Sequence, residues 1–571
     1  MSYDLVIKNG SVIDGSGAPA FHADLGIVDG KIAMIGRISD KSAETIDAEG
    51  HVVAPGFVDA HTHMDAQVFW DPLGTCSCYH GITSVVMGNC GFTLAPCAKE
   101  HSELAVRNLE RAEDISPKAM EAGIDWTWET YPDYLDAVEA QPKGINYAGY
   151  IGHSALRTYV MGERAFTEQA TDDELAAMCQ NVQEAVRAGA IGFSTSRIHQ
   201  LYTDEPVASS VAEWKEVRAI VNAMSDTGAG MFELAGEQTY RDPDLKDDWF
   251  GRQLELAVES GVPYSWGLIS GKAEPQDWRA YLELLDDVAA AGGRMFAQVH
   301  SRALNSLVSF ESHTPFDSWD HWRELRALPL EEQMVKLRDP AIKAKLVDIA
   351  TDPGGKAFPN HWGAMVSQPP NWDKVRIMDT VEGEHRRMSE VAKERGVPPA
   401  ELMIDLALEH DLKLFFRTSA ANEDDGDVLA MMRHPHTVVT FSDSGAHVGQ
   451  IMDASLQTHM FSHWVRKKEA FTLEEAVRMV SFEPASRWGL HDRGLLRMGL
   501  AADVVVFDPE TIGGNMPTVE HDLPAGEMRL KQTAKGIKET VVNGQVLLRN
   551  NEHTGAFPGQ VLRGPLADSN T

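Results

Sequence analysis

Long apolar runs are missing from this sequence. No stretch approaches the roughly 18 uncharged apolar residues that a transmembrane helix requires, and the first apolar run, in MSYDLVIKNGSVIDG, already contains Asp4 and Lys8. A run interrupted by charges in this way is not a secretory signal. We therefore expect a cytoplasmic protein that has no membrane partner.

Cysteine and positive charge are also scarce. The 571 residues include 5 cysteines, and 51 lysines and arginines stand against 85 aspartates and glutamates, for a formal net charge of −34. An odd, small number of cysteines in a long chain argues against a disulfide framework. The negative charge repels nucleic acid, so we expect a small-molecule partner and no nucleic acid. The sequence leaves assembly into a homo-oligomer open.

Three common functional motifs are absent as well. The sequence has neither a G-x-x-x-x-G-K-[ST] phosphate loop nor a G-x-G-x-x-G fingerprint in a suitable setting, so it does not indicate nucleotide chemistry. Ser194 follows an apparent strand in AIGFSTSR. It lacks the G-x-S-x-G turn that would present a serine nucleophile.

Short strand patterns are present at both ends of the chain. Asp29-Gly30 and Asn543-Gly544 have the composition of hairpin turns, and VIKNGSVID near the start resembles TVVNGQVLL near the end. We predict one small composite β-sandwich domain from residues 1–55 plus 485–571. The alternative is a chance resemblance between two common hairpin sequences.

Residues 56–484 alternate between short β-branched runs and helical stretches, as in a parallel βα architecture. The helix predicted after Thr171 has a capping-box glutamate, Glu174, and a stop at Gly189. The pattern predicts an α/β fold, a (β/α)8 TIM barrel with its chemistry at the C-terminal ends of the strands. The eight strand candidates are GFVDAHTH, TSVVMGNC, NYAGYIGH, AIGFSTS, GMFELAG, PYSWGLIS, RMFAQVHS and TVVTFSDSG.

Residues 302–375 break this alternation and are predicted to be an insertion or lid over the strand ends. The segment is rich in tryptophan, proline and histidine. Trp319, Trp322 and Trp362 either line an apolar substrate pocket or simply pack within an irregular segment.

Candidate metal ligands stand at the ends of three predicted strands. His61 and His63 are two residues apart and therefore face the same side, and two neutral imidazoles suit a divalent metal such as zinc. Asp443 ends the eighth strand, which adjoins the first in a closed ring. We predict it as a metal ligand and as the catalytic residue that takes a proton from water and returns it to a leaving group. Cys90 ends the second strand as a candidate thiolate ligand. Each residue also has an alternative interpretation. His61 and His63 would be ordinary surface or core histidines, Asp443 a helix N-cap, and Cys90 an inert buried thiol.

The motifs VVAPGFVDAHTH, SVVMGNCG, GHSALR, AIGFSTS, FSDSGAHVG and RGLLRMGLAADVVVFDP resemble those of the metal-dependent amidohydrolase superfamily. Within it, the sequence is similar to the N-acyl-D-amino-acid deacylase (D-aminoacylase-like) branch over nearly the whole chain. The resemblance implies a barrel flanked by a β-sandwich from both termini, and a zinc-activated water that attacks an amide carbonyl. His61, His63 and Asp443 match the family's metal and catalytic positions, and Cys90 matches the cysteine that characterises the branch.

The sequence also departs from that branch. The resemblance to D-aminoacylases implies further histidine ligands at the ends of strands five and six. In this sequence those two strand ends read GMFELAGE and PYSWGLISGK, and neither contains a histidine. We therefore expect one tightly bound divalent metal, Zn2+ being the first candidate, and regard a second metal site as doubtful. Glu233 and His300 either replace the missing ligands or line the substrate pocket. No lysine ends strand four, which argues against a carbamylated-lysine bridge.

Further substrate-binding candidates are His153 and His447, which either contact substrate, orient Asp443 or stabilise turns. One of Arg157, Arg302 and Arg417 could hold a substrate carboxylate, because a guanidinium offers a bidentate fork. Together these residues predict a metal-dependent hydrolase of the amide C–N bond of a small N-acylated compound such as an N-acyl-D-amino acid. The alternatives are an amidohydrolase acting on an aryl amide, cyclic amide, lactone or urea, and a non-catalytic barrel that binds a ligand or partner.

Overall fold

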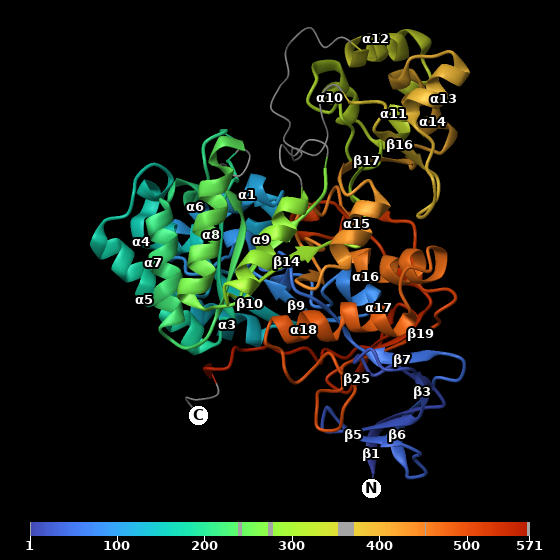
Figure 1. Cartoon of the computed structure of the whole chain (residues 1–571). Helices are drawn as coiled ribbons and strands as arrows, with labels where there is room; N and C mark the ends of the chain where they lie inside the picture. Colours follow the sequence, from blue (N-terminus) through green and yellow to red (C-terminus); the bar gives the residue numbers. More distant parts are fainter. Residues whose placement is uncertain are drawn as a thin grey trace.

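The structure of the protein is a computed structural model, and it describes residues 2–201, 203–237, 243–271, 278–351, 370–451 and 453–567. Its centre is a sheet of eight strands in the order β18-β14-β13-β12-β11-β10-β9-β8, in which all neighbouring strands are parallel. A bridge between Thr62 and Ser444 joins the chain after β8 to the chain after β18, which closes the ring. The predicted α/β barrel is confirmed (Figure 1). Its strands are β8 (Phe57–Asp59), β9 (Ile82–Met87), β10 (Asn146–Gly152), β11 (Gly192–Arg197), β12 (Met231–Glu237), β13 (Tyr264–Leu268), β14 (Met295–Val299) and β18 (Thr437–Val439).

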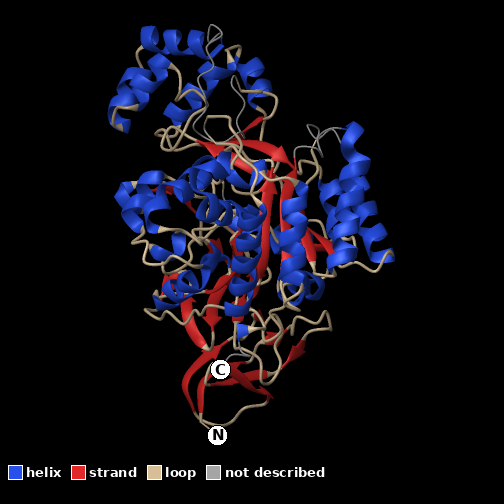
Figure 2. Ribbon diagram, turned by 90° about the vertical axis from the view of Figure 1, so that its left-hand side faces the viewer, coloured by secondary structure: helices blue, strands red, loops and turns tan. Residues whose placement is uncertain are grey.

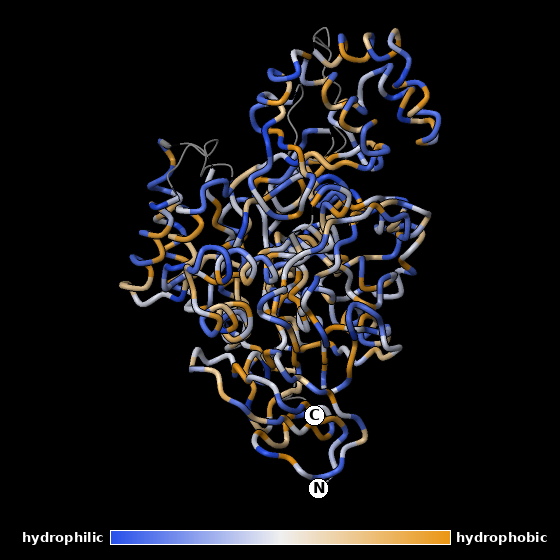
Figure 3. Tube along the Cα trace, turned by 90° about the vertical axis from the view of Figure 1, so that its right-hand side faces the viewer, coloured by the Kyte–Doolittle hydropathy of each residue, from blue (hydrophilic) through white to orange (hydrophobic). Residues whose placement is uncertain are grey.

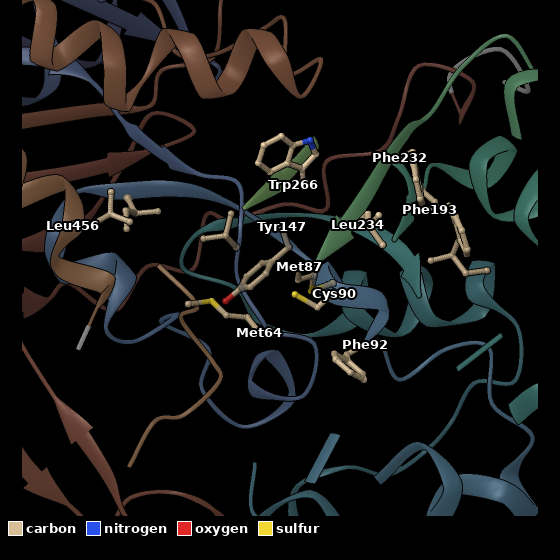
Figure 4. Close-up of a cluster of buried hydrophobic side chains, with 14 of the residues drawn as sticks. Met64, Met87, Cys90, Phe92, Tyr147, Phe193, Phe232, Leu234, Trp266 and Leu456 are labelled. Atoms are coloured by element: carbon tan, nitrogen blue, oxygen red, sulfur yellow. The ribbon is translucent and has the colours of Figure 1, made fainter. Parts of the chain in front are cut away.

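Consecutive residues of the barrel strands face opposite sides, as a β-strand requires. Val85 packs in the large cluster that also holds core residues of the helices, whereas its neighbour Val86 packs with Tyr150 and Phe296 in a separate cluster. Figure 4 shows residues of the large cluster, including Met87, Phe193 and Phe232. The strands are thus buried on both faces, which explains why they read as nearly continuous apolar runs.

Helices surround the strands, as Figure 2 shows. The predicted capping box is present in α5, where the side chains of Thr171 and Glu174 each accept a hydrogen bond from the backbone N–H of the other. Gly189 ends that helix in a left-handed conformation. The helices of this part of the chain are α1 (Ser102–Ala112), α2 (Pro117–Gly123), α3 (Tyr131–Ala140), α4 (His153–Met161), α5 (Asp172–Ala188), α6 (Ala208–Val211), α7 (Trp214–Ser225), α8 (Lys246–Ser260), α9 (Trp278–Ala290), α15 (Asp425–Met432), α16 (Leu456–His459), α17 (Leu473–Val480) and α18 (Phe482–Arg487). None of the described helices is long and apolar enough to cross a membrane.

Strands from the two ends of the chain share one sheet. Its order is β26-β25-β24-β19-β7-β2-β3, and β7 (Val52–Pro55) pairs directly with β19 (Val504–Phe507). The predicted hairpin turn at Asn543-Gly544 joins β24 (Ile537–Val542) to β25 (Gln545–Arg549). The other strands of this sheet are β2 (Ser11–Val12), β3 (Phe21–His22) and β26 (Glu552–His553).

A second sheet from the N-terminal segment packs against the first. Its order is β5-β4-β1-β6, and the predicted Asp29-Gly30 turn joins β4 to β5. Leu5 and Ile27 of this sheet share a hydrophobic cluster with Val53 and Val504 of the seven-stranded sheet. The strands are β1 (Tyr3–Lys8), β4 (Asp24–Val28), β5 (Lys31–Gly36) and β6 (Ser42–Asp47), and two short pairs follow, β20 (Gly513–Gly514) with β23 (Ala534–Lys535) and β21 (Thr518–Glu520) with β22 (Arg529–Lys531).

Between β14 and β18 the chain forms an additional unit, seen at the top of Figure 1. Its antiparallel sheet has the order β15-β17-β16, and its helices carry alternating hydrophilic and hydrophobic segments (Figure 3). The unit extends to Ala421, whereas the predicted insertion over 302–375 ends at the first residue of β16. The elements are β15 (Leu304–Val308), α10 (Asp320–Arg326), α11 (Leu330–Leu337), α12 (Pro340–Thr351), β16 (Val375–Met378), α13 (Met388–Arg395), α14 (Pro399–Glu409) and β17 (Phe415–Ala421).

Trp319 and Trp322 belong to the core of this unit. Their rings lie 5.3 Å and 4.5 Å from the ring of Phe316, and the indole nitrogen of Trp322 donates to the carbonyl oxygen of Leu346 at 3.0 Å. The packing alternative therefore holds for these two tryptophans. Trp362 lies outside the described residues.

Candidate metal centre

His61, His63 and Asp443 are placed by the closure of the barrel. The backbone N–H of Asp443 donates to the oxygen of His61 at 3.2 Å, and the N–H of His63 donates to the oxygen of Ser444 at 2.7 Å. The chain after the first strand is thereby tied to the chain after the eighth. This confirms the expectation that the two segments adjoin, and it explains how residues far apart in the sequence meet.

The glycine of the SDSGAH motif has a steric role here. Gly445 has a φ of +100°, and a Cβ atom at this position would overlap the backbone oxygen of His63. Only glycine combines this conformation with such a close approach of two chain segments. The motif thus permits the crossing that brings Asp443 to the histidines.

The three side chains converge on one point. The Nε2 atom of His61 lies 3.3 Å from Oδ1 of Asp443, and the Nε2 atom of His63 lies 3.4 Å from the same oxygen. The histidine side chains are 1% and 2% exposed, whereas that of Asp443 is 21% exposed. Asp443 is therefore the member of the group that reaches the open space.

The protonation of His61 is set by a neighbour that sequence reasoning missed. Nδ1 of His61 lies 2.5 Å from Oε1 of Gln298, whose amide nitrogen donates to the hydroxyl of Ser265 at 2.9 Å. Because that amide oxygen can only accept, the imidazole proton belongs on Nδ1, and Nε2 keeps its lone pair. Gln298 stands two residues before His300 in AQVH, so strand periodicity places both on the same face.

Burial and the shared carboxylate act in opposite directions on these groups. Burial lowers the pKa of His63 to about 4, although Asp443 partly offsets this shift. Burial alone would raise the pKa of Asp443, but hydrogen bonds from His61 and His63 bring it below its ordinary value. At neutral pH the group therefore offers an ionised carboxylate and a neutral His63.

Cys90 is a further neighbour of His61. Its sulfur is 3.5 Å from Nε2 of His61, and its backbone N–H donates to Oε2 of Glu233 at 2.8 Å. Figure 4 shows Cys90 beside Met87 and Leu234. Burial, followed by the charges of Glu233, Glu113 and Asp443, raises the pKa of the thiol well above its ordinary value. Glu233 is fully buried, and burial raises its pKa to about 7.

Glu113 is a further buried carboxylate that the sequence did not reveal. It follows α1 directly, is 3% exposed, and places Oε2 3.4 Å from Nε2 of His63. Its backbone oxygen accepts the N–H of His447 at 2.7 Å. No spacing in RAEDIS marks Glu113, because it reaches the site from a loop and not from a strand end.

The pocket beside the candidate metal centre has a volume of about 490 Å³, and it is lined by His61, His63, Cys90, Glu113 and Asp443. Its walls carry the aromatic residues Trp249, Trp266, Trp278 and Tyr281, supplied by α8, β13 and α9. His447 and Phe441 complete the wall beside Asp443. Of the predicted residues, the pocket brings together His61, His63, Cys90, Asp443 and His447.

The structure does not bring His153 and Arg157 into this pocket. His153 lies 2.8 Å from both the hydroxyl of Thr195 and Oε1 of Glu216, while Arg157 donates to the two oxygens of Glu216 at 2.5 and 2.6 Å. Both residues are fully buried. They form a closed ion-pair network, so the expectation that they contact substrate is replaced by a structural role.

Arg302 and Arg417 line a different cleft, between the barrel and the additional unit. Arg417 lies on β17, and burial together with Arg302 and Arg376 lowers its pKa to about 10. His300 is fully buried after β14, where its Nδ1 accepts the N–H of Arg302 at 3.1 Å. Neither arginine nor His300 lines the pocket above Asp443, so none of them is placed for the substrate contact expected of it.

The donor set fits a divalent metal. Bonds of roughly 2.0–2.1 Å around a four-coordinate zinc imply neighbouring donors about 3.4 Å apart. The His61–Asp443 and His63–Asp443 spacings are 3.3 and 3.4 Å, and Gln298 leaves Nε2 of His61 available. The nitrogen and sulfur atoms of His61, His63 and Cys90 also lie within 4.8 Å of one another.

Comparison with known proteins now identifies the class. The model of the amidohydrolase family matches residues 44–548. The chain belongs to this family, as its sequence motifs indicated.

Particular relatives narrow the resemblance. The chain is 29% identical to the D-aminoacylase of Alcaligenes xylosoxydans xylosoxydans over 98% of this chain and 97% of that protein. It is 27% identical to the N-acyl-D-aspartate deacylase of the same organism, over 98% and 95% of the two chains. The solved structure of N-acyl-D-glutamate deacylase from Bordetella bronchiseptica, complexed with zinc and a phosphonate mimic of the tetrahedral intermediate, has a TM-score of 0.65 at 25% identity, covering 99% of this chain and 100% of that one. A D-aminoacylase structure with a TM-score of 0.66 at 23% identity, over 98% and 100% of the chains, has the same fold.

Proposed function

We propose that the protein is a metal-dependent hydrolase of the amide C–N bond of a small N-acylated compound. The observation that carries this proposal is the convergence of His61, His63 and Asp443 at the base of one pocket, with both imidazole Nε2 atoms 3.3–3.4 Å from Oδ1 of Asp443. Membership of the amidohydrolase family supports the bond type, and the zinc in the structure of the Bordetella bronchiseptica relative supports the metal.

His61, His63 and Asp443 would hold the metal, and Cys90 stands beside them as a further donor. When bound, a divalent ion polarises a carbonyl oxygen and lowers the pKa of water. The protein contributes the arrangement of ligands. Gln298 fixes the His61 tautomer, and the buried surroundings keep His63 neutral at pH 7.

Asp443 is the group that would move the proton. Its pKa is held low by the two histidines, so it begins as a carboxylate, and its exposed face reaches the pocket. It would accept a proton from the water whose oxygen attacks the amide carbon. The same proton would pass to the amide nitrogen as the C–N bond breaks, which releases a carboxylic acid and an amine.

The pocket limits the substrate to a small molecule. Its volume of about 490 Å³ falls in the usual range for small ligands, roughly 300–1,000 Å³. The names of the relatives, D-aminoacylase and N-acyl-D-aspartate deacylase, support an N-acyl-D-amino acid as the first substrate to test.

One observation favours a second candidate, an aryl amide. Trp249, Trp266 and Trp278 line the pocket and offer flat apolar surface. Arg111, the arginine among the described residues that line it, already pairs with Asp204 at 2.7 Å. The predicted carboxylate-binding arginines Arg157, Arg302 and Arg417 lie elsewhere.

The test combines metal analysis, a substrate panel and one variant. The zinc-loaded protein should hydrolyse members of a panel of N-acyl-D-amino acids, N-acyl-L-amino acids and aryl amides. Asp443→Asn should lower kcat/KM by about 1,000-fold or more, because it removes a general base and a ligand together. Asp287→Asn, an equivalent change on the exposed face of α9, should leave kcat/KM unchanged. A fully active Asp443→Asn protein would refute the proposal.

A further inference from the structure

Glu113 has the position of a ligand but lies outside every motif of the sequence. Its backbone oxygen accepts the N–H of His447 at 2.7 Å, and its side chain is 4% exposed. Its Oε2 atom lies 3.4 Å from Nε2 of His63. The carboxylate thus contacts the group formed by His61, His63 and Asp443 at His63, whereas Cys90 contacts it at His61.

The surroundings of Glu113 contain no cation that would balance its charge among the described residues. The neighbouring charges that act on it belong to Asp443, Asp65 and Glu233, all carboxylates. The basic side chain it contacts in the described part of the chain is His63, whose lowered pKa keeps it neutral at pH 7, and the Oε1 atom of Glu113 is buried there with no hydrogen-bond partner. A buried carboxylate in such surroundings is unfavourable unless it is protonated or bound to a cation.

The geometry at His63 favours a cation. Nε2 of His63 faces two carboxylate oxygens, Oδ1 of Asp443 and Oε2 of Glu113, at 3.4 Å each. An imidazole nitrogen carries at most one proton and can satisfy one strong acceptor. A metal ion placed among the three atoms would satisfy the nitrogen lone pair and both oxygens. The 3.4 Å spacing also equals the separation of about 3.4 Å between donors of a four-coordinate zinc site.

We propose that Glu113 is a ligand of the metal centre, together with His61, His63 and Asp443. This inference rests on the proposed function only in that a divalent metal binds at these histidines. Two nitrogen and two carboxylate donors would neutralise the ion within the protein. Such a set accepts manganese, iron or cobalt as well as zinc, since carboxylates suit harder cations.

A direct test uses the unmodified protein. Crystals of the full chain soaked with zinc should show an anomalous peak within about 2.0–2.2 Å of a Glu113 oxygen, the usual zinc–carboxylate distance. A zinc ion bound by His61 and His63 but more than 3 Å from Glu113 would overturn the inference and leave the proposed function intact. Failure to bind zinc at all would overturn both.

A second test measures metal affinity without substrate. Glu113→Gln keeps the shape of the side chain, and its affinity for zinc should fall by more than about 100-fold, beyond the roughly 10–100-fold typical of residues that only support a ligand. The absorption spectrum of the cobalt-loaded variant should change as well. The matched control is Glu121→Gln, on the exposed face of α2. Equal zinc affinity and equal cobalt spectra for the two variants, both folded by circular dichroism, would reject the assignment.

Discussion

Two buried clusters in this protein combine histidine with carboxylate, and they differ in how the carboxylate charge is balanced. The mouth cluster consists of His61, His63, Glu113 and Asp443. The arginine cluster consists of His153, Arg157 and Glu216, in which Arg157 neutralises Glu216 through contacts of 2.5 and 2.6 Å. Among the described residues, the carboxylates of the mouth cluster contact histidines but no lysine or arginine.

The difference lies in how the charge of each buried carboxylate is balanced. A buried carboxylate paired with a guanidinium and an imidazole is complete and has no need of a ligand. Burial would raise the pKa of Glu216, but His153 and Arg157 bring it to about 2. Glu113 and Glu233 in and beside the mouth cluster have raised pKa values instead, because burial and like charges are not balanced there.

The largest effect should follow from breaking the arginine cluster. Glu216→Gln would leave Arg157 buried without a carboxylate, which we expect to lower the free energy of unfolding by about 3–5 kcal/mol. Urea denaturation measures this change. Glu121→Gln, the exposed counterpart, should change stability by less than about 0.5 kcal/mol. An unaltered urea midpoint for Glu216→Gln would show that the cluster is not a structural ion pair.

The same cluster predicts a dependence on acid pH. The lowered pKa of Glu216 stabilises the fold above its ordinary value of 4.5, and this stability is lost as the pH falls towards about 2. The stability difference between the wild type and Glu216→Gln should therefore shrink, by up to about 1.4 kcal/mol per pH unit in this window. Urea titrations at several pH values test this. A constant difference from pH 7 to pH 3 would contradict it.

Metal should act on the mouth cluster alone. Free zinc at 100 times its dissociation constant should add about 2.7 kcal/mol to the free energy of unfolding of the metal-free protein. Glu216→Gln should gain the same increment, because its cluster contributes no ligand. Asp443→Asn should gain less, and equal gains for all three proteins would contradict the distinction between the clusters.

The smallest effect concerns the pocket that opens above the mouth cluster. Trp266→Leu would remove an aromatic face, and we expect kcat/KM for an aryl substrate to fall by about tenfold. Trp266→Phe retains an aromatic ring and should remain near the wild type. If a small formyl amide lost as much activity as the aryl substrate in Trp266→Leu, the residue would have a purely structural role.

Much of the fold could be predicted from the sequence. The eight barrel strands were recognisable because both faces are buried, which makes them apolar throughout, and the turns at Asp29-Gly30 and Asn543-Gly544 were marked by residues that tolerate left-handed backbone. The extent of the additional unit was not recognisable, because its second half, from β16 to β17, again alternates strand and helix as the barrel does.

The site was predictable where its residues end strands. The i, i+2 spacing of His61 and His63 and the position of Asp443 after the last strand follow from barrel geometry. Glu113 comes from a loop, and the aromatic wall comes partly from the helices α8 and α9, so neither has a local pattern. His153 and Arg157 also follow a strand end, but both bind Glu216, which is distant in sequence. No sequence pattern predicts that partner.

The pairing of β7 with β19 has a consequence for biosynthesis. Val52–Pro55 pairs on one side with Ser11–Val12, but its neighbour on the other side, Val504–Phe507, is available only after more than four hundred further residues have been translated. A nascent chain that begins to fold from its N-terminus holds an unpaired strand edge throughout that interval. Chaperone demand during synthesis should therefore fall once Val504–Phe507 has emerged from the ribosome.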